Sequence, residues 1–126
     1  MTKTAKDMVT EAKSRVENLD PTQVAQEQER GAVIVDLRDG PEIKENGKIP
    51  GSVHIPRGML EFRADTTSPY HDASLNPDRR IILHCASGGR SALGAMTLQE
   101  MGYTHVAHLD GGFKSWVEQD QPIEQG

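Results

Sequence analysis

The chain has 126 residues, enough for one domain built around a single hydrophobic core. Its formal net charge is -5, and no cluster of lysine or arginine is available for a nucleic-acid backbone. One cysteine excludes an internal disulfide, and neither it nor the 5 scattered histidines have metal-site spacing. Residues 1–15 lack the apolar core of a signal peptide or membrane span. We therefore expect a cytoplasmic protein with no metal, organic cofactor, nucleic-acid partner or membrane partner.

The first half of the chain is predicted to alternate short helices with short strands. Asp20, Pro21 and Gln23 make a favourable helix start, because they supply an N-cap, a proline at the first helical position and a glutamine at the third. The apolar run Val33–Leu37 indicates a buried strand. The expected elements are a helix over 5–14 within an N-terminal extension of residues 1–14, an edge strand over 15–19, a helix from Asp20 to about Gly31, a strand over 33–37, a short helix over 41–45 and a strand over 52–55.

The second half continues the alternation after a loop-rich interval. Residues 68–77 contain two prolines and no apolar period, which indicates a loop. Gly102 stands where a left-handed helix cap is expected. The expected elements are a helix over 57–63, a strand over 80–84, a helix over 91–101, a strand over 106–109 and a helix over 112–119. Strands separated by helices predict one three-layer α/β/α domain over 1–126 with a central, mostly parallel sheet.

The segment HCASGGRS, residues 84–91, contains the only cysteine. A free cysteine is often a small buried hydrophobe, which is the simplest interpretation of Cys85. However, Cys85 follows a buried strand and precedes a glycine-rich loop and a helix, and open α/β sheets bind ligands at that position. A helix N-terminus and a nearby arginine, here Arg90, both favour the reactive thiolate.

The residues around Cys85 have the composition of an anion-binding loop. Gly88 and Gly89 let the backbone curl so that several amides converge, as in sites for phosphate or sulfate. Arg90 adds a positively charged guanidinium group whose N–H donors have a fixed, planar geometry. We predict Cys85 and Arg90 as catalytic residues, and Ala86, Ser87, Gly88, Gly89, Ser91 and Arg57 as anion-binding residues.

Four segments in order resemble the rhodanese family of sulfurtransferases. HCASGGRS resembles the active-site loop, and Asp36-Leu37-Arg38 resembles the family's strand end. Residues 47–52 resemble the G-H-I-x-G-A stretch, with Lys48 in place of histidine and Ser52 in place of alanine. Residues 109–113 with Trp116 resemble the closing L-x-G-G-x-x-x-W. The match runs from about Asp20 to Val117, and it implies a five-stranded sheet with the cysteine loop near its middle.

The resemblance implies a thiosulfate sulfurtransferase that works through a persulfide on Cys85, with cyanide or a thiol as acceptor. Four residues separate Cys85 from Arg90, which goes with sulfur chemistry, whereas a cysteine phosphatase or arsenate reductase uses a longer spacer. A protein acceptor is a further candidate partner. A sulfur-carrier or anion-binding module fed by a protein partner would share the same loop and stays open as the alternative.

Other polar residues have a structural interpretation that competes with a functional one. Asp36, Arg38 and Glu42 follow a strand, and we expect Arg38 to pair with Glu42 or a neighbour and tie loops together. His84 should point to the sheet face opposite to Cys85, because successive strand residues alternate. Arg57 is either a solvated arginine or a second positive group at the pocket rim, which residues 56–75 are expected to shape.

Overall fold

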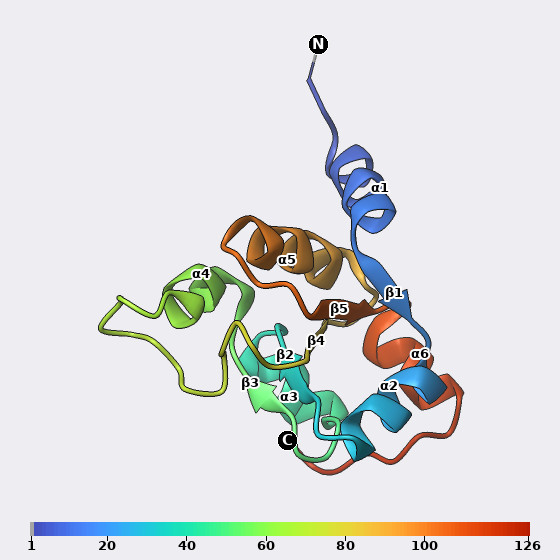
Figure 1. Cartoon of the computed structure of the whole chain (residues 1–126). Coiled ribbons are helices and arrows are strands. Elements are labelled where there is room, and N and C mark those ends of the chain that lie inside the picture. Colours follow the sequence, from blue (N-terminus) through green and yellow to red (C-terminus); the bar gives the residue numbers. More distant parts are fainter. Residues whose placement is uncertain (1) are drawn as a thin grey trace.

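A five-stranded parallel sheet forms the centre of the computed structural model, which describes residues 2–126 (Figure 1). The strands are β1 (Glu17–Leu19), β2 (Val33–Asp36), β3 (Val53–His54), β4 (Ile81–His84) and β5 (Val106–Leu109). Their order is β1-β5-β4-β2-β3, and every neighbouring pair is parallel. The predicted sheet is confirmed and is parallel throughout. Because β4 lies in the middle, its carboxyl end brings Cys85 to the centre of the sheet edge.

Helices cover both faces of the sheet (Figure 1). One face carries α1 (Ala5–Arg15), the 3-10 turn η1 (Arg57–Met59), α4 (Leu60–Ala64) and α5 (Gly89–Glu100). The other carries α2 (Pro21–Glu29), α3 (Gly40–Asn46) and α6 (Gly112–Glu118). No helix in residues 2–126 is long and apolar enough to cross a membrane.

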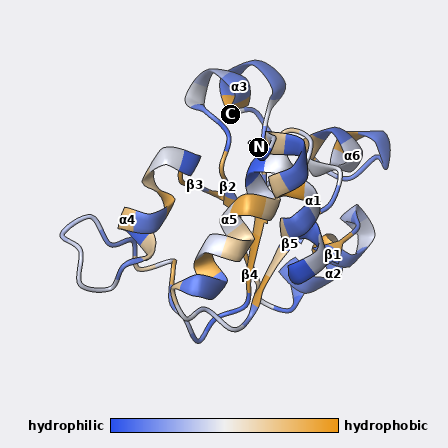
Figure 2. Ribbon diagram, turned by 90° about the horizontal axis from the view of Figure 1, so that it is seen from above, coloured by the Kyte–Doolittle hydropathy of each residue, from blue (hydrophilic) through white to orange (hydrophobic). Residues whose placement is uncertain are grey.

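Two apolar cores lie on opposite sides of the sheet, because alternate strand residues point to opposite faces. Leu83 of β4 packs with Leu60 and Leu98 under α4 and α5. Ile82, its neighbour in sequence, packs with Trp116 on the face covered by α2 and α6. Figure 2 shows β4 in hydrophobic colours, whereas the outer helices α2 and α3 carry hydrophilic stretches. The continuous apolar sequence of β4 is thus explained by burial on both faces.

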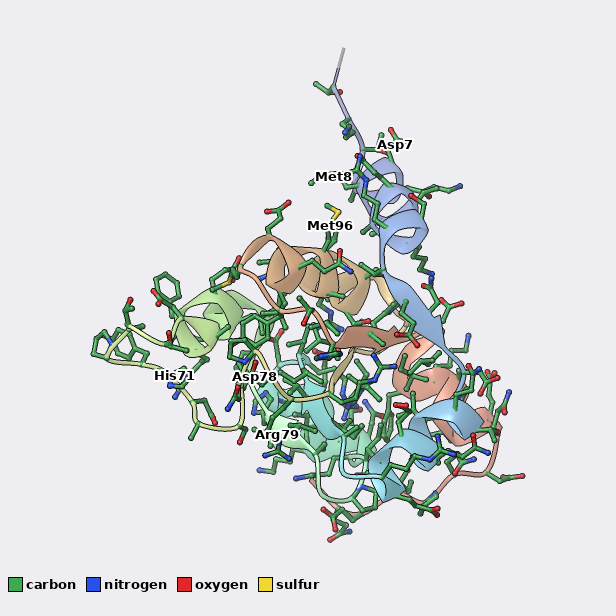
Figure 3. The ribbon with its side chains drawn as sticks, viewed as in Figure 1. Asp7, Met8, His71, Asp78, Arg79 and Met96 are labelled. Carbon is green, nitrogen blue, oxygen red and sulfur yellow. The ribbon has the colours of Figure 1, made fainter. Side chains whose placement is uncertain are left out.

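The N-terminal helix α1 packs against α5. Thr4 caps it: its side chain accepts a hydrogen bond from the Asp7 amide at 3.0 Å, and the Asp7 carboxylate accepts one from the Thr4 amide at 3.2 Å. Figure 3 shows Met8 of α1 and Met96 of α5 on the facing sides of the two helices. The helix predicted over 5–14 is therefore present as a packed element; residue 1 of the extension lies outside the described residues.

Most predicted elements are present with ends shifted by one or two residues. The Asp20 cap forms as expected, since its side chain accepts a hydrogen bond from the Gln23 amide at 2.8 Å. The helix after the cysteine begins at Gly89 instead of residue 91, because Gly88 takes the N-cap position with φ of 108°. The helix predicted over 57–63 is a 3-10 turn followed by the short α4.

Candidate active site

Cys85 lies directly after β4, at the floor of a loop that leads into α5. Its side chain is 1% exposed. The Gly88 amide donates a hydrogen bond to Cys85 Sγ at 3.1 Å, and the Ser91 hydroxyl oxygen lies 3.6 Å from the sulfur. Gly88 has φ of 108°, a left-handed conformation that favours glycine and lets the chain turn from the loop into α5. The loop thus directs a backbone donor at the sulfur, where it stabilises negative charge.

Five further amides of this loop have no hydrogen-bond acceptor within residues 2–126. They belong to Ala86, Ser87, Gly89, Arg90 and Ser91. Three of these residues open α5, where helix geometry leaves the first amides without partners. Unpaired amides next to a sulfur nucleophile suit an anion or a charged sulfur adduct.

The N-terminus of α6 braces the loop from the other side. The Phe113 amide donates to the Cys85 carbonyl at 2.8 Å, and the Lys114 amide donates to the Ala86 carbonyl at 3.1 Å. Gly112 allows this approach, because a Cβ on it would lie 2.6 Å from the Ala86 carbonyl carbon. Glycine at position 112 is therefore explained by close backbone packing against the cysteine loop, whereas a Cβ on Gly111 would meet the Ser115 side chain of α6 at 2.7 Å.

Arg90 is held by Glu42 of α3. Its guanidinium donates two hydrogen bonds to the carboxylate, at 2.8 and 2.9 Å. These bonds lower the pKa of Glu42 to about 2. The same contact raises the pKa of Arg90, and the charge of Cys85 contributes in the same direction. Arg90 therefore lies within electrostatic reach of Cys85, but a carboxylate already neutralises it.

Arg38 pairs with its neighbour Asp36. Its Nη2 lies 2.8 Å from Asp36 Oδ2, and both side chains are 1% exposed. Arg38 also donates to the Gly47 carbonyl at 2.9 Å and lies over the Phe113 ring, 4.2 Å from its centroid. Burial opposes ionisation of Asp36, yet the Arg38 hydrogen bonds hold its pKa below the usual value. The prediction that Arg38 ties loops together is confirmed.

His84 lies on the face opposite to α5, as the strand alternation predicts. Its ring stacks on Phe113 with centroids 6.2 Å apart. Burial lowers the pKa of His84 to about 4, although Asp36 opposes that shift. Among the described residues, His84 Nε2 has no hydrogen-bond partner, and Asp36 Oδ2 is 3.6 Å away. His84 is therefore a packed, neutral histidine.

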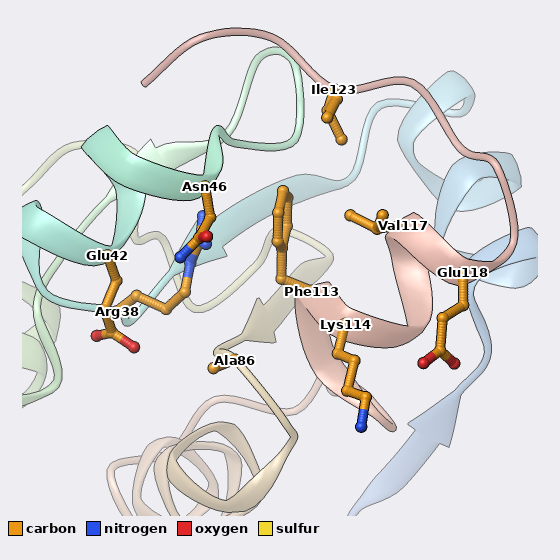
Figure 4. Close-up of a pocket in the computed structure, with 9 residues that line it drawn as sticks. All are labelled: Arg38, Glu42, Asn46, Ala86, Phe113, Lys114, Val117, Glu118 and Ile123. Carbon is orange, nitrogen blue, oxygen red and sulfur yellow. The ribbon is translucent and has the colours of Figure 1, made fainter.

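A cavity of about 390 Å³ opens beside Ala86 (Figure 4). Phe113, Val117 and Ile123 form its apolar walls, and Figure 4 shows Ile123 on the C-terminal segment across the cavity from Ala86. That segment is anchored by a hydrogen bond from Trp116 Nε1 to the Pro122 carbonyl. It is also anchored by an isolated antiparallel β-bridge between the backbones of Lys48 and Glu124. The remaining lining residues are polar or charged: Arg38, Glu42, Asn46, Lys114 and Glu118.

The predicted site residues are only partly brought together. Cys85, Gly88 and Ser91 are in contact, Ala86 borders the cavity, and Ser87 is exposed on the loop. Arg57 instead donates to Glu61 at 2.9 Å and to Thr97 at 3.4 Å. Neither Arg57 nor any other residue of 56–75 lines the cavity beside Ala86, and Cys85 does not line it either; its walls come from β2–α3, α6 and the C-terminal segment.

Sequence reasoning missed His108 and the C-terminal wall. His108 of β5 is fully buried and shares a hydrogen bond with Ser91 Oγ at 2.9 Å. The sequence did offer one signal for His108, since it is a polar residue inside the apolar strand 106–109. No sequence pattern pointed to Ile123, because nothing local ties residues 120–126 to α3. Within residues 2–126, no group of three or more His, Cys, Asp or Glu residues could hold a metal.

The rhodanese-like domain profile matches residues 20–119 of the chain. The chain therefore belongs to the rhodanese-like family. It is 36% identical to the thiosulfate sulfurtransferase GlpE of Stutzerimonas stutzeri, over 76% of this chain and 80% of that protein. It is also 36% identical to the putative sulfur carrier protein YrkF of Bacillus subtilis, over 67% of this chain. The chain spans 40% of the Bacillus protein and 57% of a rhodanese-like relative from mouse.

Solved structures share the whole architecture. A protein of unknown function from Rhodopseudomonas palustris, described as a possible tyrosine phosphatase, has a TM-score of 0.92 and 44% identity, covering 98% of this chain and 96% of that one. The polysulfide-sulfur transferase of Wolinella succinogenes has a TM-score of 0.78 and 28% identity, covering 96% and 87%. The chain thus has the rhodanese fold and belongs to a family of sulfurtransferases and sulfur carriers.

Proposed function

We propose that this protein is a thiosulfate sulfurtransferase that carries sulfur on Cys85. The Cys85 thiolate attacks the outer sulfur of thiosulfate, the sulfur–sulfur bond of the donor breaks, and sulfite leaves with the bonding electron pair. Cys85 then bears a persulfide anion. An acceptor nucleophile, cyanide or a thiolate, takes the outer sulfur and restores the Cys85 thiolate, so that charge and atoms balance in both steps.

One observation carries the proposal: the Gly88 amide donates to Cys85 Sγ at 3.1 Å, inside a loop whose other amides lack acceptors. Thiolate and persulfide are both anions, so the same donors support the enzyme before and after sulfur uptake. No organic cofactor or metal takes part in this scheme. The scheme requires a reduced thiol, so we propose a cytoplasmic location. We also propose that residues 1–126 form a single catalytic domain that includes the N-terminal helical extension.

Arg90 is assigned to the donor's sulfonate group. In the resting structure its guanidinium is occupied by Glu42, so donor binding exchanges one anionic partner for another. This exchange weakens the affinity for a small dianion compared with a free arginine. Arg57 remains a predicted secondary anion contact, although its side chain is bonded to Glu61 and Thr97.

The cavity beside Ala86 favours a thiol acceptor with an apolar body. Phe113, Val117 and Ile123 offer apolar surface to such a molecule, while cyanide uses none of it. The same surface also suits a protein acceptor that inserts a cysteine side chain. This observation supports the second candidate function, a sulfur carrier loaded and unloaded by protein partners, and a relative is named as a putative sulfur carrier.

A phosphatase activity is not favoured. The loop places four residues between Cys85 and Arg90, and the arginine that would hold a phosphate is paired with Glu42. Hydrolysis of an aryl phosphate by the wild type, lost in Cys85→Ser, would revive the phosphatase alternative raised by the Rhodopseudomonas protein.

Intact-mass measurement tests the proposal. Wild type and Cys85→Ser are incubated with thiosulfate, and cyanide is then added to each. We expect the wild type to gain one sulfur atom and lose it to cyanide, while the variant does neither. A wild type that gains nothing from thiosulfate overturns the small-donor enzyme, and the carrier candidate is then tested with a protein persulfide as donor.

A further inference from the structure

A line of four hydrogen-bonding side chains runs from Cys85 to the protein surface. Cys85 Sγ lies 3.6 Å from Ser91 Oγ, Ser91 Oγ lies 2.9 Å from His108 Nδ1, and His108 Nε2 lies 2.7 Å from Asn18 Oδ1. Cys85, Ser91 and His108 are at most 1% exposed, whereas Asn18 is exposed on the edge strand β1. The line joins the end of β4 to α5, β5 and β1.

The hydrogen bonds of Asn18 decide which nitrogen of His108 carries the proton. Asn18 Nδ2 donates to the carbonyls of Lys13 and Val16, at 2.9 and 3.0 Å, which turns Oδ1 toward His108. An amide oxygen only accepts, so His108 Nε2 donates to it. In a neutral imidazole the other nitrogen, Nδ1, is then an acceptor. The Ser91 hydroxyl has two acceptors, His108 Nδ1 at 2.9 Å and the Gly88 carbonyl at 3.3 Å, and we assign its proton to the nearer one. The Ser91 oxygen is then left to accept from the Cys85 thiol.

We propose that His108, acting through Ser91, takes up the proton of the Cys85 thiol and stabilises the thiolate as an ion pair. The S–H bond of Cys85 breaks as its proton passes to Ser91 Oγ, and the original Ser91 proton passes to His108 Nδ1. The products are a thiolate, an intact serine hydroxyl and an imidazolium whose Nε2–H still donates to Asn18. Ser91 touches the reacting sulfur, and His108 is a positioning residue behind it. The inference rests on the proposed function only in naming this thiolate as the sulfur-transfer nucleophile.

Burial keeps His108 neutral before the transfer and opposes its protonation, so the imidazolium forms only together with the Cys85 thiolate. Burial lowers the pKa of His108 to about 4, Asp110 opposes that shift, and Lys13 reinforces it. Lys13 and Asp110 pair with each other at 3.0 Å, which limits the net field from α1 and from the turn after β5. A neutral imidazole at pH 7 offers the free Nδ1 that the transfer requires. The thiolate then provides the negative charge that offsets the buried imidazolium.

The test is the pH dependence of Cys85 alkylation by iodoacetamide, followed by intact mass. His108→Asn keeps an acceptor oxygen near the position of Nδ1 but cannot take up a proton. We expect its alkylation rate at pH 7 to fall roughly tenfold or more. Its rate should converge with that of the wild type near the alkaline end of the profile, where hydroxide removes the thiol proton directly. Superimposable profiles for variant and wild type overturn the inference.

Four companion measurements separate proton uptake from a merely structural role. Ser91→Ala cuts the line while leaving His108 in place, so it should shift the profile in the same direction, and the double variant should shift it no further than the larger single effect. His84→Asn removes the other buried histidine, on the opposite face, and should leave the profile unchanged. The nitrogen NMR shifts of His108 should show the Nε2–H tautomer, and an Nδ1–H tautomer contradicts the assignment.

The alkylation profile does not depend on sulfur transfer. A wild type that shows the expected profile but takes no sulfur from thiosulfate contradicts the proposed function and leaves the thiolate–imidazolium pair standing. A wild type that takes up sulfur while His108→Asn alkylates normally overturns the pair and leaves the proposed function intact.

Discussion

Arg90 and Glu42 form a two-fold hydrogen bond beside the cysteine loop, at 2.8 and 2.9 Å. Each side chain is about one-third exposed, 36% for Arg90 and 32% for Glu42, so the pair is partly screened by water. A donor sulfonate that binds Arg90 competes with this carboxylate. Under the proposed function, the pair therefore limits how strongly Arg90 attracts a small oxyanion.

Removing the carboxylate should strengthen donor binding. We expect Glu42→Gln to lower the KM for thiosulfate roughly threefold to tenfold, with little change in kcat, because it frees Arg90 and removes a repelling charge. Steady-state kinetics at varied thiosulfate provide the measurement. Glu118→Gln, which removes a carboxylate elsewhere on the cavity wall, is the matched control and should change KM much less. An unchanged KM in Glu42→Gln contradicts the competition.

Removing the guanidinium should have the opposite effect. Arg90→Ala should raise the KM for thiosulfate more than it lowers kcat, because the lost interaction binds the donor before and during the transfer. The double variant with Glu42→Gln should recover part of the loss, since the carboxylate left unpaired by Arg90→Ala repels the dianion. Unaltered donor dependence in Arg90→Ala would remove Arg90 from the site.

The C-terminal wall of the cavity should select among acceptors. Ile123→Ala should raise the KM for a thiol acceptor with an apolar body by roughly threefold to tenfold, because part of the apolar contact is lost. The KM for cyanide should not change, since cyanide makes no such contact. Ile123→Val keeps most of the contact and is the control. Equal effects on both acceptors indicate that Ile123 supports the fold instead of the acceptor.

The close packing of Gly112 against the cysteine loop predicts a large loss of stability on substitution. A Cβ there would lie 2.6 Å from the Ala86 carbonyl, with φ of 63°. Gly102→Ala is matched to it, because Gly102 has φ of 99° but a Cβ added there would meet nothing within 4 Å. We expect Gly102→Ala to cost about 1 kcal/mol from backbone strain alone. Gly112→Ala should cost clearly more by urea unfolding, and equal costs contradict the packing argument.

Two buried histidines predict an acid-sensitive fold. Burial lowers the pKa of His84 and of His108 to about 4, from 6.5. The unfolded chain therefore binds more protons than the folded chain between pH 6.5 and 4, and stability falls as pH falls through that window. Protonation of each histidine lowers the free energy of unfolding by on the order of 3 kcal/mol at most. Urea unfolding at several pH values checks this slope, which should be shallower in His108→Asn.

The positions of secondary structure were readable from the sequence because they depend on local rules. The Asp20 cap, the apolar run before Cys85 and the left-handed Gly102 each act within a few residues of chain. The strand–loop–helix order around Cys85 follows from the same local signals, and it sufficed to identify the candidate nucleophile and its loop. The alternation of strand residues also placed His84 away from α5.

Only the tertiary structure decided which distant groups meet at the site. Arg90 pairs with Glu42 and His108 with Ser91 because the strand order and the helix packing bring α3 and β5 to the cysteine loop. The cavity wall at Ile123 depends on the bridge between Lys48 and Glu124. Sequence spacing determines the backbone of one loop, but the charge and proton partners of that loop come from segments far along the chain, and their distances are set by the packing of the whole domain.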